Sequence, residues 1–309
     1  MKMSLAPRIR VAAERIFRQK ETENGRLAGK KRDFVPYIFL APSFVLVTVF
    51  ILIPFIDVVR RSFFSAMSNQ FVGLKNYIVL FQNDAFRLAG WNTIKFTLVC
   101  IPILLIFSLL LALAVSAFKE QRGVFKTSFL LPMAIPVASI VLLWKAVFEK
   151  QGLLNAVLEW AGLAPIDWIY SEFAFFVLVF TYLWKNVGYD MVLWLSGISG
   201  IPPALYESAQ IDGAGAVQRF FRITLPNLMP TVFTTAVLSL LNSFKVFREA
   251  YLIAGAYPDK SIYMLQHLFN NWFASLDIDK MCAGAVVMAL VVFAVILLLQ
   301  RLLGREESQ

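Results

Sequence analysis

Charged residues are scarce in this chain, and their scarcity excludes an ordinary soluble protein. Asp, Glu, Lys and Arg make up 16% of the 309 residues, whereas hydrophobic residues make up 59% and the mean hydropathy is +0.69. Soluble domains typically carry about 25% charged and about 45–50% apolar residues. So few charged side chains could not cover a water-exposed surface at this length, and the composition therefore indicates a membrane protein.

Residues that bind metals or attack substrates are equally rare. The chain has two cysteines, Cys100 and Cys282, and one histidine, His267, in a segment that we expect to be an exposed loop. The cysteines lack the spacing of a metal site and are expected to be packing residues, with a disulfide between them left open. No metal site is predicted, and the few polar groups in the apolar runs weigh against a membrane-embedded enzyme.

A phosphate loop for nucleotide binding is also missing. The nearest approach to G-x-x-x-x-G-K-[ST], at residues 25–31, is one residue short and lacks the final Ser or Thr. It lies in a basic segment with no predicted strand before it. We therefore predict that the chain hydrolyses no ATP and is not itself an enzyme.

Long apolar runs are what the sequence has instead. Because a membrane-spanning helix needs about 20 mostly apolar residues, six runs are candidates: 37–59, 96–118, 127–144, 173–196, 228–244 and 281–300. The fourth is the least regular, since it contains Lys185 and Asp190. Prolines inside the runs, including Pro136, are expected to be tolerated because neighbouring helices can satisfy the freed backbone groups. The runs predict an all-α, polytopic membrane protein with six transmembrane helices.

The distribution of Lys and Arg predicts the orientation of these helices. Ten of these basic residues lie in residues 1–36. The connections expected on the same side of the membrane as this tail, together with the C-terminal end, bring that side to seventeen. The connections on the other side hold nine, and Lys245 and Arg248 are among them. Since basic loops stay in the cytoplasm, both termini and the loop at residues 201–227 are predicted to be cytoplasmic. The net charge of +9 is attributed to the basic tail as an orientation signal and not to nucleic-acid binding.

The predicted organisation follows from these assignments. Residues 1–36 form a basic cytoplasmic tail, and residues 37–92 form the first transmembrane helix with an outer loop. Residues 93–303 form a core of five transmembrane helices, and residues 304–309 form a short cytoplasmic tail.

The polar segment at residues 207–230, ESAQIDGAGAVQRFFRITLPNLMP, is the most informative part of the chain. A helix that begins near Pro203 would place Leu205, Ser208 and Asp212 on one narrow face. Gly213 can adopt the left-handed turn that ends such a helix, and Asp212 could cap the helix that follows. A second short helix is predicted over residues 214–223.

This segment resembles the EAA signature of permease subunits of ABC importers. The matching residues are Glu207, Ser208, Ala209, Asp212, Gly213, Ala214, Ile223, Leu225 and Pro226, with Ser208 in place of the usual Ala. The resemblance extends from about Tyr37 onward through weaker features, such as Pro42 and the segment at residues 71–77. In these features the chain is similar to the first permease of the maltose, lactose and glycerol-3-phosphate importers.

The resemblance implies a subunit of an ATP-driven importer for a sugar or oligosaccharide in the inner membrane of a prokaryotic cell. It implies a second permease subunit as a heterodimer partner, an ABC ATPase dimer that uses ATP and Mg, and an extracytoplasmic solute-binding protein. The segment from Glu207 to Gly213 would dock on the ATPase and couple its motion to the pore. The permease itself would hold no cofactor.

Two other classes of function are weighed against this one. An importer of another small solute would share the signature loop and differ only in cargo. A secondary transporter or channel would leave the loop unexplained, and we see no convincing internal repeat of the kind such transporters carry.

Two groups of residues are candidates for the solute path. Lys185 and Asp190 lie within a predicted span, where charged groups usually face a cavity or a partner. Their five-residue separation points them to different sides, and contact with solute or pairing with neighbouring helices are both open. Tyr263, Asn270 and Trp272 offer the aromatic faces and amide groups that suit sugars, although aromatic residues also gather at membrane interfaces, the reading that we favour.

Overall fold

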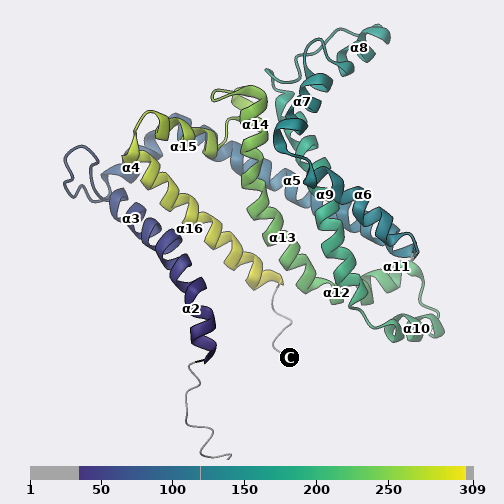
Figure 1. The fold of residues 1–309 in the computed structure, drawn as a ribbon. Coiled ribbons are helices and arrows are strands. Elements are labelled where there is room, and N and C mark those ends of the chain that lie inside the picture. Colours follow the sequence, from purple (N-terminus) through teal and green to yellow (C-terminus); the bar gives the residue numbers. More distant parts are fainter. Residues whose placement is uncertain (1–34, 119, 304–309) are drawn as a thin grey trace, which may run out of the picture. The chain divides into compact units, whose positions relative to one another are not determined.

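The part of the chain that the structure describes is helical. The structure, a computed structural model, describes residues 35–118 and 120–303, so the two predicted tails lie essentially outside it. Within these residues strand pairing is limited to one bridge between Phe64 and Phe71 (Figure 1). The all-α prediction is confirmed for the described residues. The described residues divide between Asp57 and Val58 into two units, which are described separately.

The first unit contains an apolar helix. α2 (Val35–Val47), η1 (Thr48–Leu52) and the start of α3 (Ile53–Ser62) follow one another without a break. The helical stretch Tyr37–Ser62 has a hydropathy of 2.5 and no buried residue in its most apolar window. A helix that is apolar all round and has no buried face is typical of contact with lipid.

A wide π-helical turn precedes a proline at two places in the chain. η1 ends two residues before Pro54, and η2 (Phe220–Thr224) ends two residues before Pro226. In a regular α-helix the proline ring would clash with the carbonyl four residues earlier. The local widening therefore accommodates each proline without ending the helix.

The core of the second unit is built around two long helices. α5 (Asp84–Ala117) packs along α9 (Ala174–Ser199), while α6 (Arg122–Ala134) and α13 (Met229–Ser243) also pack against α9 (Figure 1). One buried cluster joins Phe96 and Leu104 of α5 to Leu178 of α9. A second joins α9 to the start of α13 through Trp194 and Leu228.

Polar side chains at the beginning of α5 hydrogen bond to the backbone of residues 260–265. Asn92 Nδ2 donates to the carbonyls of Lys260, in η4 (Lys260–Ile262), at 2.6 Å and of Tyr263 at 2.9 Å. Thr93 Oγ1 accepts from the backbone N–H of Leu265 at 3.1 Å. These contacts place α15 (Leu265–Ala274) beside α5, where α16 (Ile278–Leu303) and α4 (Lys75–Gln82) also pack.

Three helices among the described residues are long and apolar enough to cross a membrane. They are Tyr37–Ser62, α5 and α16, and the number rises to five if each of two bent pairs is one span. The pairs are Arg122–Ala134 with Val137–Trp160, bent by 89°, and Ala216–Asn227 with Met229–Ala254, bent by 66°. α9 has 26 residues but is not among them, because polar residues such as Lys185 and Asp190 lower its hydropathy.

The prediction of one continuous helix over residues 127–144 is wrong. α6 ends at Ala134 and α7 (Val137–Phe148) begins after Pro136, with an 89° bend between them. Ile135 has an extended backbone (φ −73°, ψ 132°), the conformation that a following proline favours. Pro136 was therefore not absorbed within the helix, and it separates two helical segments.

The end predicted for the fifth run, at residue 244, is also wrong. α13 continues through η3 (Phe244–Val246) into α14 (Phe247–Ala254). Lys245 and Arg248, assigned to an outer loop because they are charged, therefore lie on this helical continuation. Tertiary contacts keep the segment helical, since α14 packs against α7 and α15.

Gly188 permits the close approach of α6 to α9. A Cβ atom at Gly188 would lie 1.8 Å from the carbonyl oxygen of Phe129, a backbone atom that cannot rotate away. We expect Gly188→Ala to push the helices apart and to lower the free energy of unfolding by about 1–3 kcal/mol. The measurement is the thermal unfolding midpoint of the detergent-solubilised protein.

The matched control is Gly90→Ala in α5, where a Cβ would meet nothing within 4 Å. That variant should be equal to or more stable than the parent, because Ala is favoured over Gly inside a helix. Equal midpoints for the two variants would contradict the packing role of Gly188.

Candidate functional site: an exposed loop helix and a polar cavity

α10 (Pro203–Ile211) forms the exposed part of the predicted signature loop. Pro203 stands at the start of the helix, where its missing N–H costs no hydrogen bond. None of the residues of α10 is buried, and Glu207 and Ser208 are exposed while Ala209 is half-buried. Figure 1 shows α10 at the lower right edge of the second unit. The first three predicted signature residues, Glu207, Ser208 and Ala209, therefore lie on a helix whose surface is accessible to another protein.

Gly213 ends α10 as predicted. Its φ is +76°, and its N–H donates to the Gln210 carbonyl at 3.1 Å, while the Ala214 N–H donates to the Ala209 carbonyl at 2.8 Å. This is the Schellman arrangement, which requires the left-handed conformation that glycine adopts most readily. The prediction that Asp212 caps the next helix is wrong, because α11 (Ala216–Arg219) begins after Gly215 and has no side-chain cap.

Two connections join α10 to the helical core. The hydroxyl of Tyr206 hydrogen bonds to Oγ1 of the buried Thr224 at 2.9 Å, and Tyr206 and Ile223 pack against the cluster that contains Trp194. The chain itself continues through α11, η2 and α12 (Leu225–Asn227) before it bends into α13. Helical structure thus runs past the predicted end at residue 223, and a displacement of α10 has a direct path to α13.

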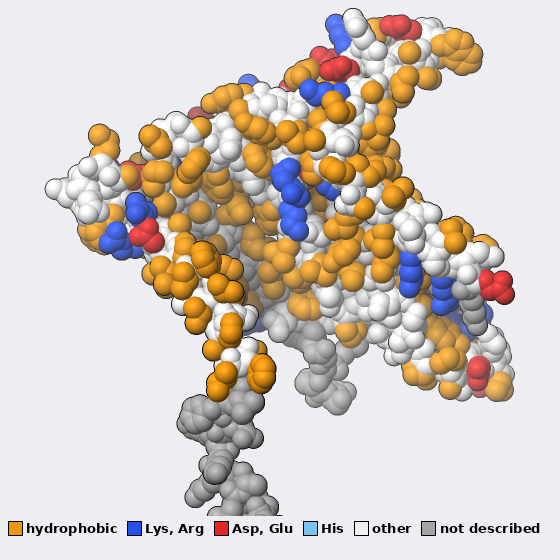
Figure 2. Space-filling view, in the orientation of Figure 1, with side chains coloured by type: hydrophobic (Ala, Val, Ile, Leu, Met, Phe, Trp, Pro, Cys, Tyr) orange, Lys and Arg blue, Asp and Glu red, His pale blue; other side chains and the backbone are white. Residues whose placement is uncertain are grey.

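Apolar side chains on the loop face solvent. Ile211 is 88% exposed, Val217 is 71% exposed and Phe221 is 61% exposed. In Figure 2 hydrophobic and charged side chains alternate on the surface over α10 and α11. Large apolar groups that stay exposed beside charged ones are typical of a surface that contacts a protein partner.

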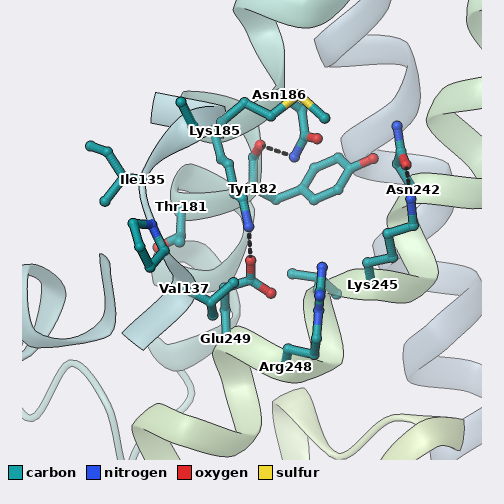
Figure 3. A pocket seen from close by; sticks show the side chains of 14 residues that line it. Ile135, Val137, Thr181, Tyr182, Lys185, Asn186, Asn242, Lys245, Arg248 and Glu249 are labelled. Carbon is teal, nitrogen blue, oxygen red and sulfur yellow. Dashed lines mark hydrogen bonds and ion pairs between the residues drawn. The ribbon is translucent and has the colours of Figure 1, made fainter. Parts of the chain in front are cut away.

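A polar cavity of about 330 Å³ lies among the helices of the second unit (Figure 3). Its wall combines the break between α6 and α7, the middle of α9, and the passage from α13 to α14. The polar and charged residues of the wall are Thr181, Tyr182, Lys185, Asn186, Asn242, Lys245, Arg248 and Glu249. The two features that the sequence did not predict, the Pro136 break and the helical continuation, are thus the features that build the cavity.

Lys185 and Glu249 form an ion pair across the cavity wall, from α9 to α14 (Figure 3). Their side chains are 13% and 4% exposed, and Glu249 Oε2 makes no hydrogen bond among the described residues. Asp190 accepts a hydrogen bond from Ser239 Oγ at 2.6 Å instead. Both charged residues of α9 therefore pair with neighbouring helices, on different sides, and Lys185 also lines the cavity.

Two further cations line the cavity and are exposed. Lys245 Nζ donates to Asn242 Oδ1 at 2.8 Å, whereas Arg248 has no hydrogen bond or ion pair within the described residues. Sequence reasoning missed Lys245, Arg248 and Glu249 because the span was ended at residue 244. The signal was present: Asn242, Lys245 and Glu249 follow the 3/4 spacing of one helix face.

The second group of solute-path candidates lies away from the cavity. Trp272 is 7% exposed and its ring stacks on Phe86 with 6.4 Å between centroids, which places it in the core. The hydroxyl of Tyr263 accepts from Asn271 Nδ2 at 3.0 Å. Neither these two residues nor the half-buried Asn270 lines the cavity.

His267 and the cysteines are all buried. His267 Nδ1 accepts from the backbone N–H of Met264 at 3.3 Å, so the expectation of an exposed loop histidine is wrong. Burial lowers the pKa of His267 to about 4, and the ring is therefore neutral at pH 7. No disulfide joins Cys100 and Cys282, which answers the question that the sequence left open.

Comparison with known proteins assigns the chain to a family. Residues 90–306 match the family described as "Binding-protein-dependent transport system inner membrane component". The probable ABC transporter permease protein YurN of Bacillus subtilis is 32% identical over 290 residues, covering 90% of this chain and 99% of that protein. The sulfoquinovosyl glycerol transport system permease protein SmoG of Agrobacterium fabrum is 32% identical over 260 residues, covering 81% and 84%.

A solved structure agrees in fold over nearly the whole length. It is a bacterial ABC transporter involved in the import of the acidic polysaccharide alginate, with a TM-score of 0.78 and 25% identity, covering 92% of this chain and 100% of that one. The chain belongs to the binding-protein-dependent family of inner-membrane transport components. It is a membrane permease subunit of an ABC importer, and ATP hydrolysis lies on a separate subunit.

The Lys185–Glu249 pair gives a test of the cavity wall. Lys185→Met alone leaves the buried carboxylate of Glu249 without its counter-ion, and such a loss costs about 3–5 kcal/mol of stability. We expect a marked drop in the thermal unfolding midpoint of the solubilised protein. The double variant Lys185→Met, Glu249→Met removes both charges and should recover most of the loss.

The double variant carries the same Lys185→Met change, so it controls for every effect of that substitution other than the loss of the counter-ion of Glu249. A double variant as unstable as Lys185→Met alone would show that the two side chains do not act as a pair. The same conclusion would follow if the single variant kept the parental midpoint.

Proposed function

We propose that this chain forms half of the translocation pore of an ATP-driven importer for a sugar or oligosaccharide, and that α10 couples the pore to the ATPase. The observation that carries the proposal is the geometry of α10, an accessible helix held to the core through Tyr206 and Thr224. Family membership supplies the class of protein, and this helix supplies a contact surface for the subunit that hydrolyses ATP.

The carbohydrate cargo is supported by the relatives. SmoG is named for sulfoquinovosyl glycerol, and the solved importer is described for alginate, so both of those systems carry saccharides. The cavity wall has amide groups of the kind that sugar recognition uses, from Asn186 and Asn242. We therefore infer that the solute is a saccharide of which no more than about 330 Å³ occupies the cavity at one time. A small saccharide would fit whole, and a longer one would pass through in sections.

We further propose six membrane spans with both termini in the cytoplasm. The sixth span is α9, whose polar residues are acceptable in a membrane because α5, α6 and α13 surround them. The end of α16 lies at the same edge of the second unit as α12 (Figure 1), which fits a common cytoplasmic side. The excess of Lys and Arg in residues 1–36 supports this orientation.

The partners follow from the proposed role. A second permease completes the pore, an ABC ATPase dimer binds ATP and Mg and receives α10, and an extracytoplasmic solute-binding protein delivers the solute. Glu207, Ser208 and Ala209 are placed on the docking helix, and Gly213 with Ala214 sets its end. Ile223, Leu225 and Pro226 belong to the helical path that continues into the bend before α13.

Two glycines of the loop provide a matched test of coupling. A Cβ atom would meet nothing within 4 Å at Gly213 or at Gly215, but φ is +76° at Gly213 and −68° at Gly215. Gly213→Val therefore strains the end of α10 without a packing clash, whereas Gly215→Val does not. Membrane insertion should be normal for both, and solute-stimulated ATP hydrolysis should fall at least about tenfold, the equivalent of roughly 1.4 kcal/mol, only for Gly213→Val.

The measurement is ATP hydrolysis by the assembled complex, purified from its native membrane and reconstituted in lipid. Equal stimulation of the two variants would contradict a coupling role for the end of α10. A loss in both would mean that the loop surface matters but that the left-handed turn does not.

A further inference from the structure

The charged residues of the cavity do not balance. Three cations, Lys185, Lys245 and Arg248, face one anion, Glu249, and Lys185 already engages it (Figure 3). Lys245 has only the neutral Asn242 as a partner, and Arg248 has none among the described residues. The wall therefore presents two positive charges that no carboxylate of the described chain neutralises.

These cations are arranged for use by a ligand. Lys245 and Arg248 are three residues apart on one helix, so both project toward the same side. Figure 2 shows Lys and Arg side chains beside α13 and α14 in a surface that is otherwise largely hydrophobic. Charged groups at such a position in a membrane protein are costly, and they usually mark the path of an ion or a substrate.

We propose, on the basis of the importer function above, that the transported saccharide is acidic and that Arg248 and Lys245 bind its negative group. A carboxylate, sulfonate or phosphate ester shares the required chemistry, because each presents two or more oxygens to a guanidinium. Asn186 and Asn242 serve the hydroxyl groups of the same solute. A neutral sugar would use these amides and leave both cations unpaired.

Apolar residues in the cavity wall favour the binding of an anionic solute by the two cations. Ile135 and Val137, at the break between α6 and α7, place apolar groups on the side of the cavity away from Lys245 (Figure 3). A low local dielectric increases the attraction between a fixed cation and an anionic solute. The Lys185–Glu249 pair contributes no net charge and holds α9 to α14, so it positions the wall on which the free cations stand.

The test measures solute affinity in the complete complex, purified from its native membrane into lipid nanodiscs. The probes are two matched pairs: galacturonate with galactose, and trigalacturonate with its methyl ester. Titration calorimetry is run with and without a non-hydrolysable ATP analogue, so that both orientations of the pore are sampled. In at least one pair the acidic member should bind about tenfold more tightly than its neutral partner.

Arg248→Gln should weaken binding of that acidic probe about tenfold and change the affinity of the neutral probe less than about twofold. The control is Lys150→Gln, which removes an exposed cation outside the cavity and should change neither affinity. Raising the salt concentration should weaken only the acidic probe.

Equal binding of acidic and neutral members, no binding of any acidic probe, or an acidic affinity unaffected by Arg248→Gln would each overturn the proposal. ATP hydrolysis by the same preparation separates this result from failure of the importer function. A complex that hydrolyses ATP in response to a neutral sugar alone would keep the importer and exclude the acidic cargo.

Discussion

The structure depends on one constraint: α9 carries polar groups that lipid cannot satisfy, so other helices must surround it. Lys185 and Asp190 are separated by less than two turns, and each finds its partner on a different neighbouring segment, Glu249 on α14 and Ser239 on α13. α6 packs closely against another side of α9, at Gly188. Among the long helices that the structure describes, α9 is thus the most polar and buries the largest share of its residues, whereas α5 and α16 keep large apolar side chains exposed.

Two interruptions in the helices around α9 form the polar cavity and position the signature loop. Pro136 ends one helical segment and opens the wall of the cavity, while the bend at Leu228 turns the loop helices into α13. α13 lies between the two features. η2, which precedes it in the chain, is connected to α10 through the Tyr206–Thr224 hydrogen bond, and the helical continuation of α13 carries Lys245 and Arg248. A motion applied to the loop has a short path to the residues that face the cavity.

The sequence predicted the features that rest on local chemistry. The apolar runs locate the helices, and the Gly213 turn follows from the backbone freedom of glycine at a helix end. The residues at positions 207–209 predicted a loop helix, and the structure shows that helix to be exposed; its binding to a partner stays a prediction. These signals lie within a few residues of each other and need no tertiary contact to be recognised.

The misplaced features depend on tertiary contacts instead. Lys245 and Arg248 looked like loop residues because charge normally ends a membrane span, but packing of α14 against α7 keeps that segment helical. His267 looked exposed, yet its ring lies between Phe247 and Tyr263. Trp272 was expected at a membrane interface, with sugar recognition as the alternative, but its stacking on Phe86 places it in the core. No pattern along the chain identifies which distant residue fills such a site.

The most direct test of the account is purification of the tagged chain from its native membrane in mild detergent, with every co-purifying protein identified by mass spectrometry. We expect an ABC ATPase and a second permease to be recovered with the chain, together with a solute-binding protein when solute is present. Recovery of the chain alone, or of a homo-oligomer without an ATPase, would contradict the assignment of α10 as the coupling helix of a heteromeric importer.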